Sequence, residues 1–231
     1  MPITLYELAG ADPERRFSPY CWRIRFALAH KGLDVECVPW RFTETERLAF
    51  SGQGKVPVIV DEETVVVESW AIAGYLEDAY PNHPSLFGGQ AGRAHARFLN
   101  AWTDRVLLAG IARLVVRDIL DVLHPDHQDY FRTSRERAFG RSLEEVVADR
   151  DEGVLALRRL LQPVRDVLSH QPWLGGDEPD YTDYIVLGSL QWPRCASPFV
   201  LLEEGDPVRA WQLRGLALFD GLGARAPAAA A

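Results

Sequence analysis

The sequence has few cysteines, no long apolar run and no leader-like start. Its 231 residues include only three cysteines, Cys21, Cys37 and Cys195. Their spacing fits no metal-ligand motif and an odd number cannot all pair, so we expect no metal and a reducing cytoplasm. The longest apolar stretch, residues 106–116, is too short to cross a bilayer and contains Arg113. The N-terminus lacks a charged region and a small-residue cleavage site, so we expect no signal peptide.

The sequence also lacks any concentration of positive charge. Arginine and lysine number 25 against 33 aspartates and glutamates, which gives a net charge of −8. The acidity is diffuse, with −5 over residues 1–82 and −3 over the remainder. A protein that neutralises phosphates needs a basic patch or stripe. We therefore expect neither nucleic acid nor a membrane as a partner.

Apolar residues, by contrast, are plentiful. They make up 47% of the chain and include seven tryptophans, which is typical of a folded globular protein. The first third alternates between strand and helix patterns. We expect strands at 3–8, 34–40, 56–61 and 64–68, and helices at 18–30 and 69–80. The last two strands form a hairpin across Glu62–Glu63, and this order of elements is that of a thioredoxin-like domain.

Helical patterns dominate after a segment rich in proline and glycine. We expect an α/β domain over residues 1–81, a linker over 82–92 and an all-α domain over 93–231. Within the all-α domain the spacing predicts helices at 93–123, 130–148, 154–168, 180–192 and 206–223. Pro163 lies inside one of these patterns and is expected to kink that helix.

Three places in the first domain where a helix or strand begins, called junctions below, each allow two interpretations. Ser18 precedes the first helical pattern, so taken alone it indicates an N-cap. Val56–Pro57 is either an ordinary strand start or a turn with a cis peptide, which leaves the preceding backbone groups free to pair with an extended peptide. Glu68–Ser69 is either a plain cap or a helix start that binds a carboxylate through free N–H groups.

At these three junctions, and in its order of domains, the sequence resembles the glutathione transferases. The stretch SPYCWRIR is similar to SSCSWRVR of the maleylacetoacetate isomerase class, and departs from it at Pro19, Tyr20 and Cys21. Over most of the chain the resemblance is closer still to serine-type bacterial β-etherases and their fungal relatives. It covers ITLYEL, SPYCWR, HKG, VPVIVD, ESWAIAGYLEDAYP, WLGGDEPDYTDY and LFDGLG. Each motif alone is weak, but seven in order are specific.

The resemblance implies an enzyme that uses glutathione as cosubstrate. Ser18 matches the serine that activates the thiol, Val56 and Pro57 match the backbone hook for the cysteinyl moiety, and Glu68 and Ser69 match the pair that holds the γ-glutamyl end. A thiol with a pKa of about 8.5 is mostly protonated at neutral pH. A hydroxyl donor and a helix N-terminus both favour the thiolate, and Ser18 supplies both.

The thiolate would attack a small, apolar, aromatic electrophile. The first hypothesis within this class is cleavage of a β-aryl ether. The alternatives are a maleylacetoacetate-type cis–trans isomerase and a non-catalytic module that binds glutathione or a partner.

Two residues compete with Ser18 for the catalytic role. Tyr6 lies in the first strand, where tyrosine-type transferases carry their hydroxyl, but it also fits a strand aromatic packed in the core. Cys21 is one turn into the first helix, whereas glutaredoxin-like chemistry needs its thiol at the position of Ser18. We interpret Cys21 as a small buried residue.

The glycine carboxylate of glutathione needs a cation. Lys55, beside the Val56–Pro57 turn, is the better candidate, with Gln53 nearby, and Arg41 is the alternative. Solvated surface charge is the other interpretation of Lys55 and Arg41. Trp22 either walls the site or packs on the next helix.

In the second domain, Asp180 and Asp183 form a variant of the capping box, and we interpret Asp183 as structural. Four aromatic residues either line an apolar substrate pocket or belong to the core: Trp102, Tyr130, Trp192 and Phe199.

The helix from about Arg93 carries apolar residues in more directions than one core face can use, which leaves part of it for a twofold mate. The resemblance likewise implies a homodimer that pairs the first domain of one chain with the second domain of the other. Asp104 is the candidate acidic residue that approaches the γ-glutamyl amine of the neighbouring chain.

Overall fold

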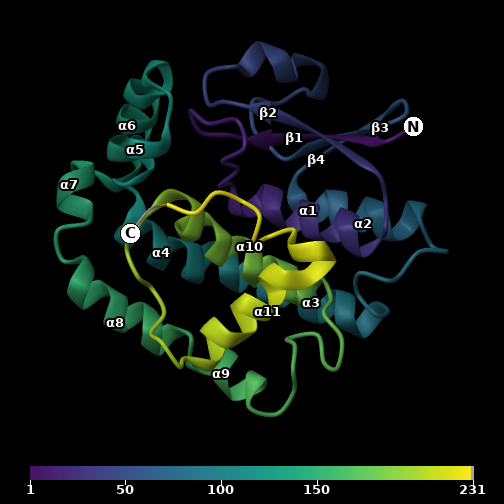
Figure 1. Cartoon of the computed structure of the whole chain (residues 1–231). Coiled ribbons are helices and arrows are strands. Elements are labelled where there is room, and N and C mark those ends of the chain that lie inside the picture. The colour runs from purple at the N-terminus through teal and green to yellow at the C-terminus, as the bar shows by residue number, and fades with distance from the viewer. Residues whose placement is uncertain (230–231) are drawn as a thin grey trace.

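A four-stranded mixed sheet forms the upper part of the molecule in the computed structural model, which describes residues 1–229 (Figure 1). Its strands are β1 (Ile3–Leu8), β2 (Val35–Trp40), β3 (Val58–Asp61) and β4 (Thr64–Val67). Their spatial order is β2-β1-β3-β4. β1 is parallel to β2 and antiparallel to β3, and β3 is antiparallel to β4. The predicted hairpin across residues 62–63 is confirmed.

Two helices cover the face of this sheet that is turned toward the rest of the chain. They are α1 (Pro19–His30) and α2 (Ser69–Ala79), and the short 3-10 helix η1 (Thr45–Ser51) follows β2. Figure 1 shows α1 and α2 between the sheet and the remaining helices. The predicted order of strands and helices is confirmed, and with it the thioredoxin-like fold, because strand alternation and helix caps are local signals.

The rest of the described chain is helical. Its elements are α3 (Gln90–Trp102), the π-helical segment η2 (Thr103–Leu107), α4 (Leu108–Val115), α5 (Ile119–Val122), α6 (Pro125–Phe139), α7 (Leu143–Val146), α8 (Arg150–Leu160), α9 (Gln162–Leu168), α10 (Tyr181–Ala196) and α11 (Pro207–Gly221). Within residues 1–229, no helix has the length and apolarity needed to cross a bilayer.

Four predicted helices prove to be broken. The helix expected at 206–223 loses helical backbone at Leu218, Phe219 and Asp220, inside α11. The helix expected at 93–123 is interrupted by η2 and again after α4. The helix expected at 130–148 ends at Gly140, whose φ of +70° favours glycine and stops α6. The helix expected at 154–168 breaks where Pro163 enters the first turn of α9, a position that proline tolerates because the N–H it lacks would be unpaired there.

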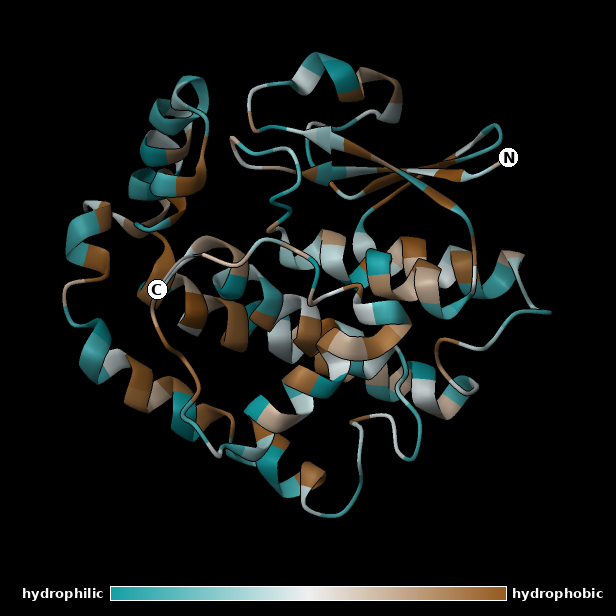
Figure 2. Cartoon of the chain, in the orientation of Figure 1, coloured by the Kyte–Doolittle hydropathy of each residue, from teal (hydrophilic) through white to brown (hydrophobic). Residues whose placement is uncertain are grey.

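Helix α10 forms the centre of the helical part, and nearly all of its side chains are buried. Figure 2 shows apolar residues concentrated where α10 meets its neighbours, with hydrophilic residues on the outer helices. A capping box of Asp180 and Asp183 starts α10. The Asp183 carboxylate accepts hydrogen bonds from the N–H of Leu174 at 2.8 Å and from the indole of Trp211 at 2.8 Å. The structural interpretation of Asp183 is confirmed.

The two parts of the molecule meet along α1 and α10. A Cβ atom at Gly188 of α10 would lie 2.6 Å from the carbonyl oxygen of Pro19, so only glycine lets the helices approach this closely. Arg23 of α1 is fully buried beside this contact. Its guanidinium donates to Asn100 at 3.1 Å and to Asp104 at 2.8 Å. A close backbone contact and a buried ion pair therefore fix α1 on the helical part.

We predict that Gly188→Ala destabilises the protein by about 1–3 kcal/mol, because the added methyl group meets backbone that cannot rotate away. The matched control is Gly110→Ala in α4, where the Cβ would meet only side-chain ends, those of Leu157 at 3.1 Å and Leu160 at 3.9 Å. Alanine is the better helix former, so the control should be neutral or stabilising. Urea unfolding of both variants checks this. Equal midpoints for the two variants would contradict the close contact.

Candidate active site

The three junctions predicted from the sequence lie at one end of the sheet. Tyr6 of β1 is paired with Val58 of β3, and Val58 with Val67 of β4. The start of β3 and the ends of β1 and β4 are therefore neighbours. α1 runs back from the end of β1 toward the start of parallel strand β2, so Ser18 begins α1 at this same end. Pro57 and Glu68, which flank the paired residues, complete the group.

Ser18 is the N-cap of α1. Its backbone is extended, and its Oγ accepts a hydrogen bond from the N–H of Cys21 at 3.3 Å. This bond occupies a lone pair on Oγ and leaves the hydroxyl proton available to donate. α1 is twelve residues long, so its N-terminal partial charge favours an anion near Ser18. The N-cap interpretation and the activating role of Ser18 are therefore compatible.

The loop that delivers Ser18 is fixed at several points. The N–H of Ala11 donates to the carbonyl of Val122 in α5 at 2.8 Å. The Arg15 guanidinium donates to the carbonyl of Cys195 at 2.8 Å. The loop is thus braced against both α5 and the end of α10, which limits the movement of the Ser18 hydroxyl.

Val56 and Pro57 precede β3 and are joined by a cis peptide bond, one of the two forms considered for this junction. Neither the N–H nor the C=O of Val56 bonds another main-chain group within the described residues. Such unpaired groups beside a strand end are able to pair with the backbone of an extended peptide.

Glu68 and Ser69 start α2. Glu68 is exposed and has a φ of +71°, a conformation that is strained for a residue with a side chain and that clusters at ligand sites. The first helical hydrogen bond of α2 runs from the N–H of Ile72 to the carbonyl of Glu68 at 2.9 Å. The N–H groups before Ile72 stay free to receive a carboxylate.

Lys55 and Arg41, the two cations considered for the glycine carboxylate, have different surroundings. Lys55 is exposed and forms no ion pair within residues 1–229. Arg41 is paired with Glu44 at 3.6 Å and donates to the carbonyl of Gly10 at 3.1 Å. Arg41 is therefore already paired, and the assignment of Lys55 to the glycine carboxylate stays a prediction. Gln53 lies half-buried in the same loop.

Trp22 and Tyr6 lie in packed surroundings. Trp22 is fully buried, and its indole N–H donates to the carbonyl of Arg16 at 2.9 Å. This favours the alternative that Trp22 packs in the core over a contact with glutathione. Tyr6 packs on Phe50 of η1, with ring centroids 5.4 Å apart. Its neighbour Glu7 faces α1, so alternation turns Tyr6 to the opposite side of the sheet, away from Ser18.

Cys21 is fully buried, as predicted, and burial raises the pKa of its thiol to about 12. A thiol in that state is protonated and unreactive at neutral pH. Among residues 1–229 the cysteines are all free, and no cluster of His, Cys, Asp and Glu suits a metal ion.

Asp104 lies in η2 with both carboxylate oxygens engaged within its own chain. Oδ1 accepts from Arg23 and Oδ2 accepts from Asn100, each at 2.8 Å. About one third of its side chain stays exposed, at 32%. The predicted role of Asp104 toward a neighbouring chain remains a prediction.

Two of the four aromatic residues considered for a substrate pocket have different partners. Tyr130 packs against Phe42, with ring centroids 6.2 Å apart. The ring of Phe199 lies 4.6 Å from the Arg150 guanidinium, near the end of α10. Tyr130 and Phe199 therefore belong to separate surroundings.

Sequence reasoning missed two residues near the site. Tyr20 is one-third exposed, two residues after Ser18, and the Arg23 guanidinium lies 4.8 Å from its ring centre. Burial, followed by the negative charge of Asp104, raises the pKa of Tyr20. The sequence signal for Tyr20 was that this position departs from the SSCSWRVR pattern.

The second missed residue is Glu7, which is fully buried between Arg16 at 3.5 Å and Arg25 at 3.6 Å. Burial raises its pKa, against the attraction of the two guanidinium groups. Through Arg16, this carboxylate holds the loop before Ser18. A single acidic residue in a strand pattern carried no signal that it would face inward.

With this geometry in hand, comparison with known proteins identifies the family. A family model described as "Glutathione S-transferase, N-terminal domain" matches residues 13–84. A second family model, "Glutathione S-transferase, C-terminal domain", matches residues 94–201. A maleylacetoacetate isomerase of Pseudomonas aeruginosa is 30% identical over 177 residues, which cover 73% of this chain and 74% of that protein. The chain belongs to the glutathione transferase family.

Two further comparisons give a shorter sequence match and a match of the fold. A zeta-class glutathione S-transferase of Euphorbia esula is 44% identical over 70 residues, and the match spans only 28% of this chain and 31% of that protein. A glutathione S-transferase of Ceriporiopsis subvermispora, solved in complex with glutathione, has the same fold. It superimposes with a TM-score of 0.81 at 22% identity and covers 99% of this chain and all of its own. None of these three names refers to β-ether cleavage, so that finer resemblance stays a prediction.

We predict that Ser18→Ala raises the pKa of glutathione bound to this chain, because the variant lacks the hydroxyl that we expect to donate to the thiolate. The thiolate absorbs in the ultraviolet, so a pH titration of that band measures the change directly. Cys21→Ala and Tyr6→Phe are the matched controls and should leave the titration unchanged. Loss of the band in Tyr6→Phe would assign the activating hydroxyl to Tyr6 instead.

Proposed function

We propose that this chain is a catalytic glutathione transferase in which Ser18 stabilises the glutathione thiolate. The observation that carries the proposal is the placement of the Ser18 hydroxyl at the start of α1, at the sheet end that also holds Val56 and the start of α2. A donor and a helix N-terminus at one point are what a thiolate requires. The family membership supports glutathione as the thiol.

The free groups at this end suit an extended tripeptide. In the proposed orientation, the γ-glutamyl carboxylate binds the N–H groups and hydroxyl at Ser69, and the Glu68 carboxylate accepts from the ammonium. The cysteinyl backbone pairs with Val56, which directs the sulfur toward Ser18. The glycine carboxylate lies at Lys55, with Gln53 beside it. Each ionic group of glutathione thereby meets a group of opposite charge or a free hydrogen-bond partner.

The chemical step follows from this arrangement. The thiol loses its proton to solvent, and the Ser18 O–H donates to the sulfur anion. The thiolate then forms a C–S bond to an electrophilic carbon of an apolar, aromatic substrate. In β-aryl ether cleavage the electron pair of the broken C–O bond leaves with the aryl oxide, which takes a proton from solvent.

Cis–trans isomerisation is the second candidate function, and a specific observation favours it. The Pseudomonas aeruginosa relative, matched over most of both chains, is named a maleylacetoacetate isomerase. In that reaction the thiolate adds to one carbon of a conjugated double bond. The bond rotates as a single bond, and the thiolate leaves to restore the double bond in the trans form. Glutathione is regenerated, whereas in ether cleavage it is consumed.

We also propose that the chain forms a homodimer and acts in a reducing cytoplasm. Phe98 of α3 and Val106 of η2 are exposed apolar side chains on the helical segment that we propose for the twofold interface. The proposed electrophile pocket is completed by the helical part of the chain.

We predict that glutathione raises the melting temperature, because a ligand that binds only the folded state stabilises it. Ser69→Ala should weaken glutathione binding about tenfold, since a hydrogen bond to a charged group is lost. Lys55→Gln should weaken it about two- to fivefold, because the ion pair is exposed. Arg141→Gln, an exposed change far along the chain, is the control. No shift in the wild type at millimolar glutathione would favour a partner-binding module.

We further predict turnover of one class in a panel of β-aryl ethers, haloaromatics and cis-dienoic acids. Consumption of glutathione with release of a phenol indicates ether cleavage, and catalysis without consumption indicates isomerisation. Ser18→Ala should lower the rate about 10²-fold, since one preorganised donor to a developing or stable anion is lost. Equal rates for Ser18→Ala and wild type would refute the role of Ser18.

A further inference from the structure

A closed network of four side chains surrounds the start of α1, and the proposed chemistry does not use it. The Glu7 carboxylate of β1 lies 3.5 Å from the Nε of Arg16 and 3.6 Å from the Nε of Arg25. The Trp22 indole donates to the carbonyl of Arg16 at 2.9 Å, and the Arg25 guanidinium lies 4.7 Å from the centre of the Trp22 ring. These four residues are called the Glu7 network below.

The Glu7 network holds the chain on both sides of Ser18. Arg16 lies two residues before Ser18, in the loop, whereas Trp22 and Arg25 lie four and seven residues after it, on α1. The backbone N–H of Trp22 also donates to the carbonyl of Ser18 at 3.1 Å. The loop and the first two turns of α1 are therefore tied to one carboxylate of β1.

Glu7 also connects the network to the strand that follows the predicted peptide hook. Its neighbour Tyr6 is paired with Val58, the residue after the Val56–Pro57 cis peptide bond. A change in how the loop sits on Glu7 would therefore move the Ser18 hydroxyl relative to Val56. The sulfur of a peptide bound at Val56 would then lie beyond hydrogen-bond distance of that hydroxyl.

The Glu7–Arg16 pair is a poor source of stability, so its presence indicates another role. The Glu7 side chain is completely buried and that of Arg16 is 6% exposed. Within the described chain, both Glu7 oxygens and the Nε and Nη1 atoms of Arg16 lack a hydrogen-bond partner. A buried ion pair without such bonds recovers little of the cost of leaving water, and apolar residues in its place are often equally stable. The pair does fix the distance between β1 and the loop.

We propose that Glu7 is a positioning residue, which through Arg16 and Trp22 holds the Ser18 hydroxyl where it donates to the glutathione sulfur. This inference rests on the proposed function of Ser18. Glu7 itself touches neither glutathione nor the electrophile, because it is buried between β1 and α1. A donor that has to reorient loses much of its stabilisation of an anion. Displacement of Ser18 therefore raises the pKa of the bound thiol.

A paired replacement separates positioning from stability. Glu7→Leu/Arg16→Leu removes one charge of each sign, so the net charge is unchanged, and we expect a melting temperature close to that of the wild type. The pKa of bound glutathione, measured from the ultraviolet band of the thiolate, should nevertheless rise by about 0.5–1 pH units. The rate at saturating glutathione should fall about tenfold. Glutathione affinity should stay at the wild-type level, since the groups proposed to bind its ends belong to other elements.

Glu7→Gln gives a sign that charge alone cannot produce. Loss of a negative charge by itself lowers the pKa of a neighbouring thiol, whereas displacement of Ser18 raises it. We expect a rise, together with a lower melting temperature because Arg16 is left buried without its partner. In the Ser18→Ala background, Glu7→Gln should cause no further rise, since Glu7 acts only through Ser18.

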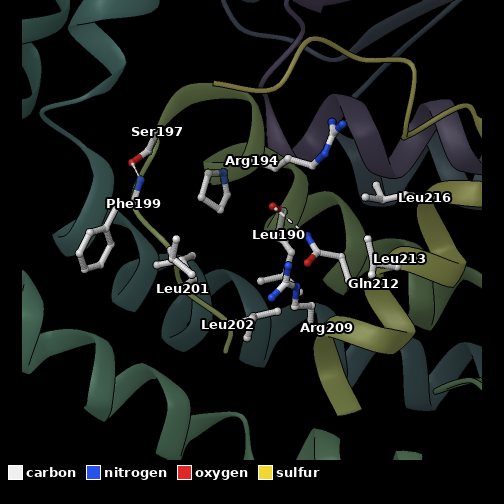
Figure 3. A pocket seen from close by; sticks show the side chains of 12 residues that line it. Leu190, Arg194, Ser197, Phe199, Leu201, Leu202, Arg209, Gln212, Leu213 and Leu216 are labelled. Atoms are coloured by element: carbon white, nitrogen blue, oxygen red, sulfur yellow. Dashed lines mark hydrogen bonds between the residues drawn. The ribbon is translucent and has the colours of Figure 1, made fainter. Parts of the chain in front are cut away.

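Asp206→Asn is the matched control, because it breaks another ion pair of low exposure. The Asp206 side chain is 8% exposed and is paired with Arg165 at 2.7 Å. Asp206 begins α11, which with the end of α10 surrounds the pocket in Figure 3. None of the described residues that line that pocket belongs to the Glu7 network. Asp206→Asn should lower the melting temperature and leave the pKa of bound glutathione unchanged.

The outcomes distinguish this inference from the proposed function. A raised pKa in Glu7→Leu/Arg16→Leu and in Glu7→Gln, absent from Asp206→Asn, supports the inference. An unchanged or lowered pKa in the paired variant overturns it, as does a further rise from Glu7→Gln in the Ser18→Ala background. A paired variant that does not fold also overturns it, because the ion pair then serves stability. In these three cases a raised pKa in Ser18→Ala alone still supports the proposed function. No shift in Ser18→Ala refutes both.

Discussion

The approach of α10 to α1 at Gly188 is the constraint on which the rest of the molecule depends. Gly188 lies against the carbonyl of Pro19, the residue directly after Ser18, so the position of α10 sets where α1 begins. Arg23 adds a buried charge that Asp104 compensates across the same interface. A buried guanidinium without its carboxylate would carry a large desolvation cost, so the two parts of the chain are held in one register. The catalytic candidate is therefore placed by the helical part as much as by its own domain.

Other buried contacts hold the loop before Ser18 in place. Buried Glu7 draws Arg16 inward from one side, and Trp22 bonds the Arg16 carbonyl from the other. A hydroxyl that stabilises an anion contributes most when it does not have to reorient during the reaction. We therefore interpret the buried charges of Glu7 and Arg16 as fixing the position of the Ser18 hydroxyl, and not only as stabilising the fold.

Much of the sheet domain was predictable from the sequence, because its signals are local. Strand alternation, the Ser18 cap and the Glu62–Glu63 turn each act over a few residues. The π-helical break at residues 103–107 was not predictable, since no glycine or proline marks it. Nor was the inward position of Glu7 or the complete burial of Trp22, because both result from packing against elements distant in the sequence. The candidate site followed the same division. Its backbone features were predicted at the junctions, whereas the sequence showed Tyr20 only as a departure from the SSCSWRVR pattern, and its contact with Arg23 came from the structure.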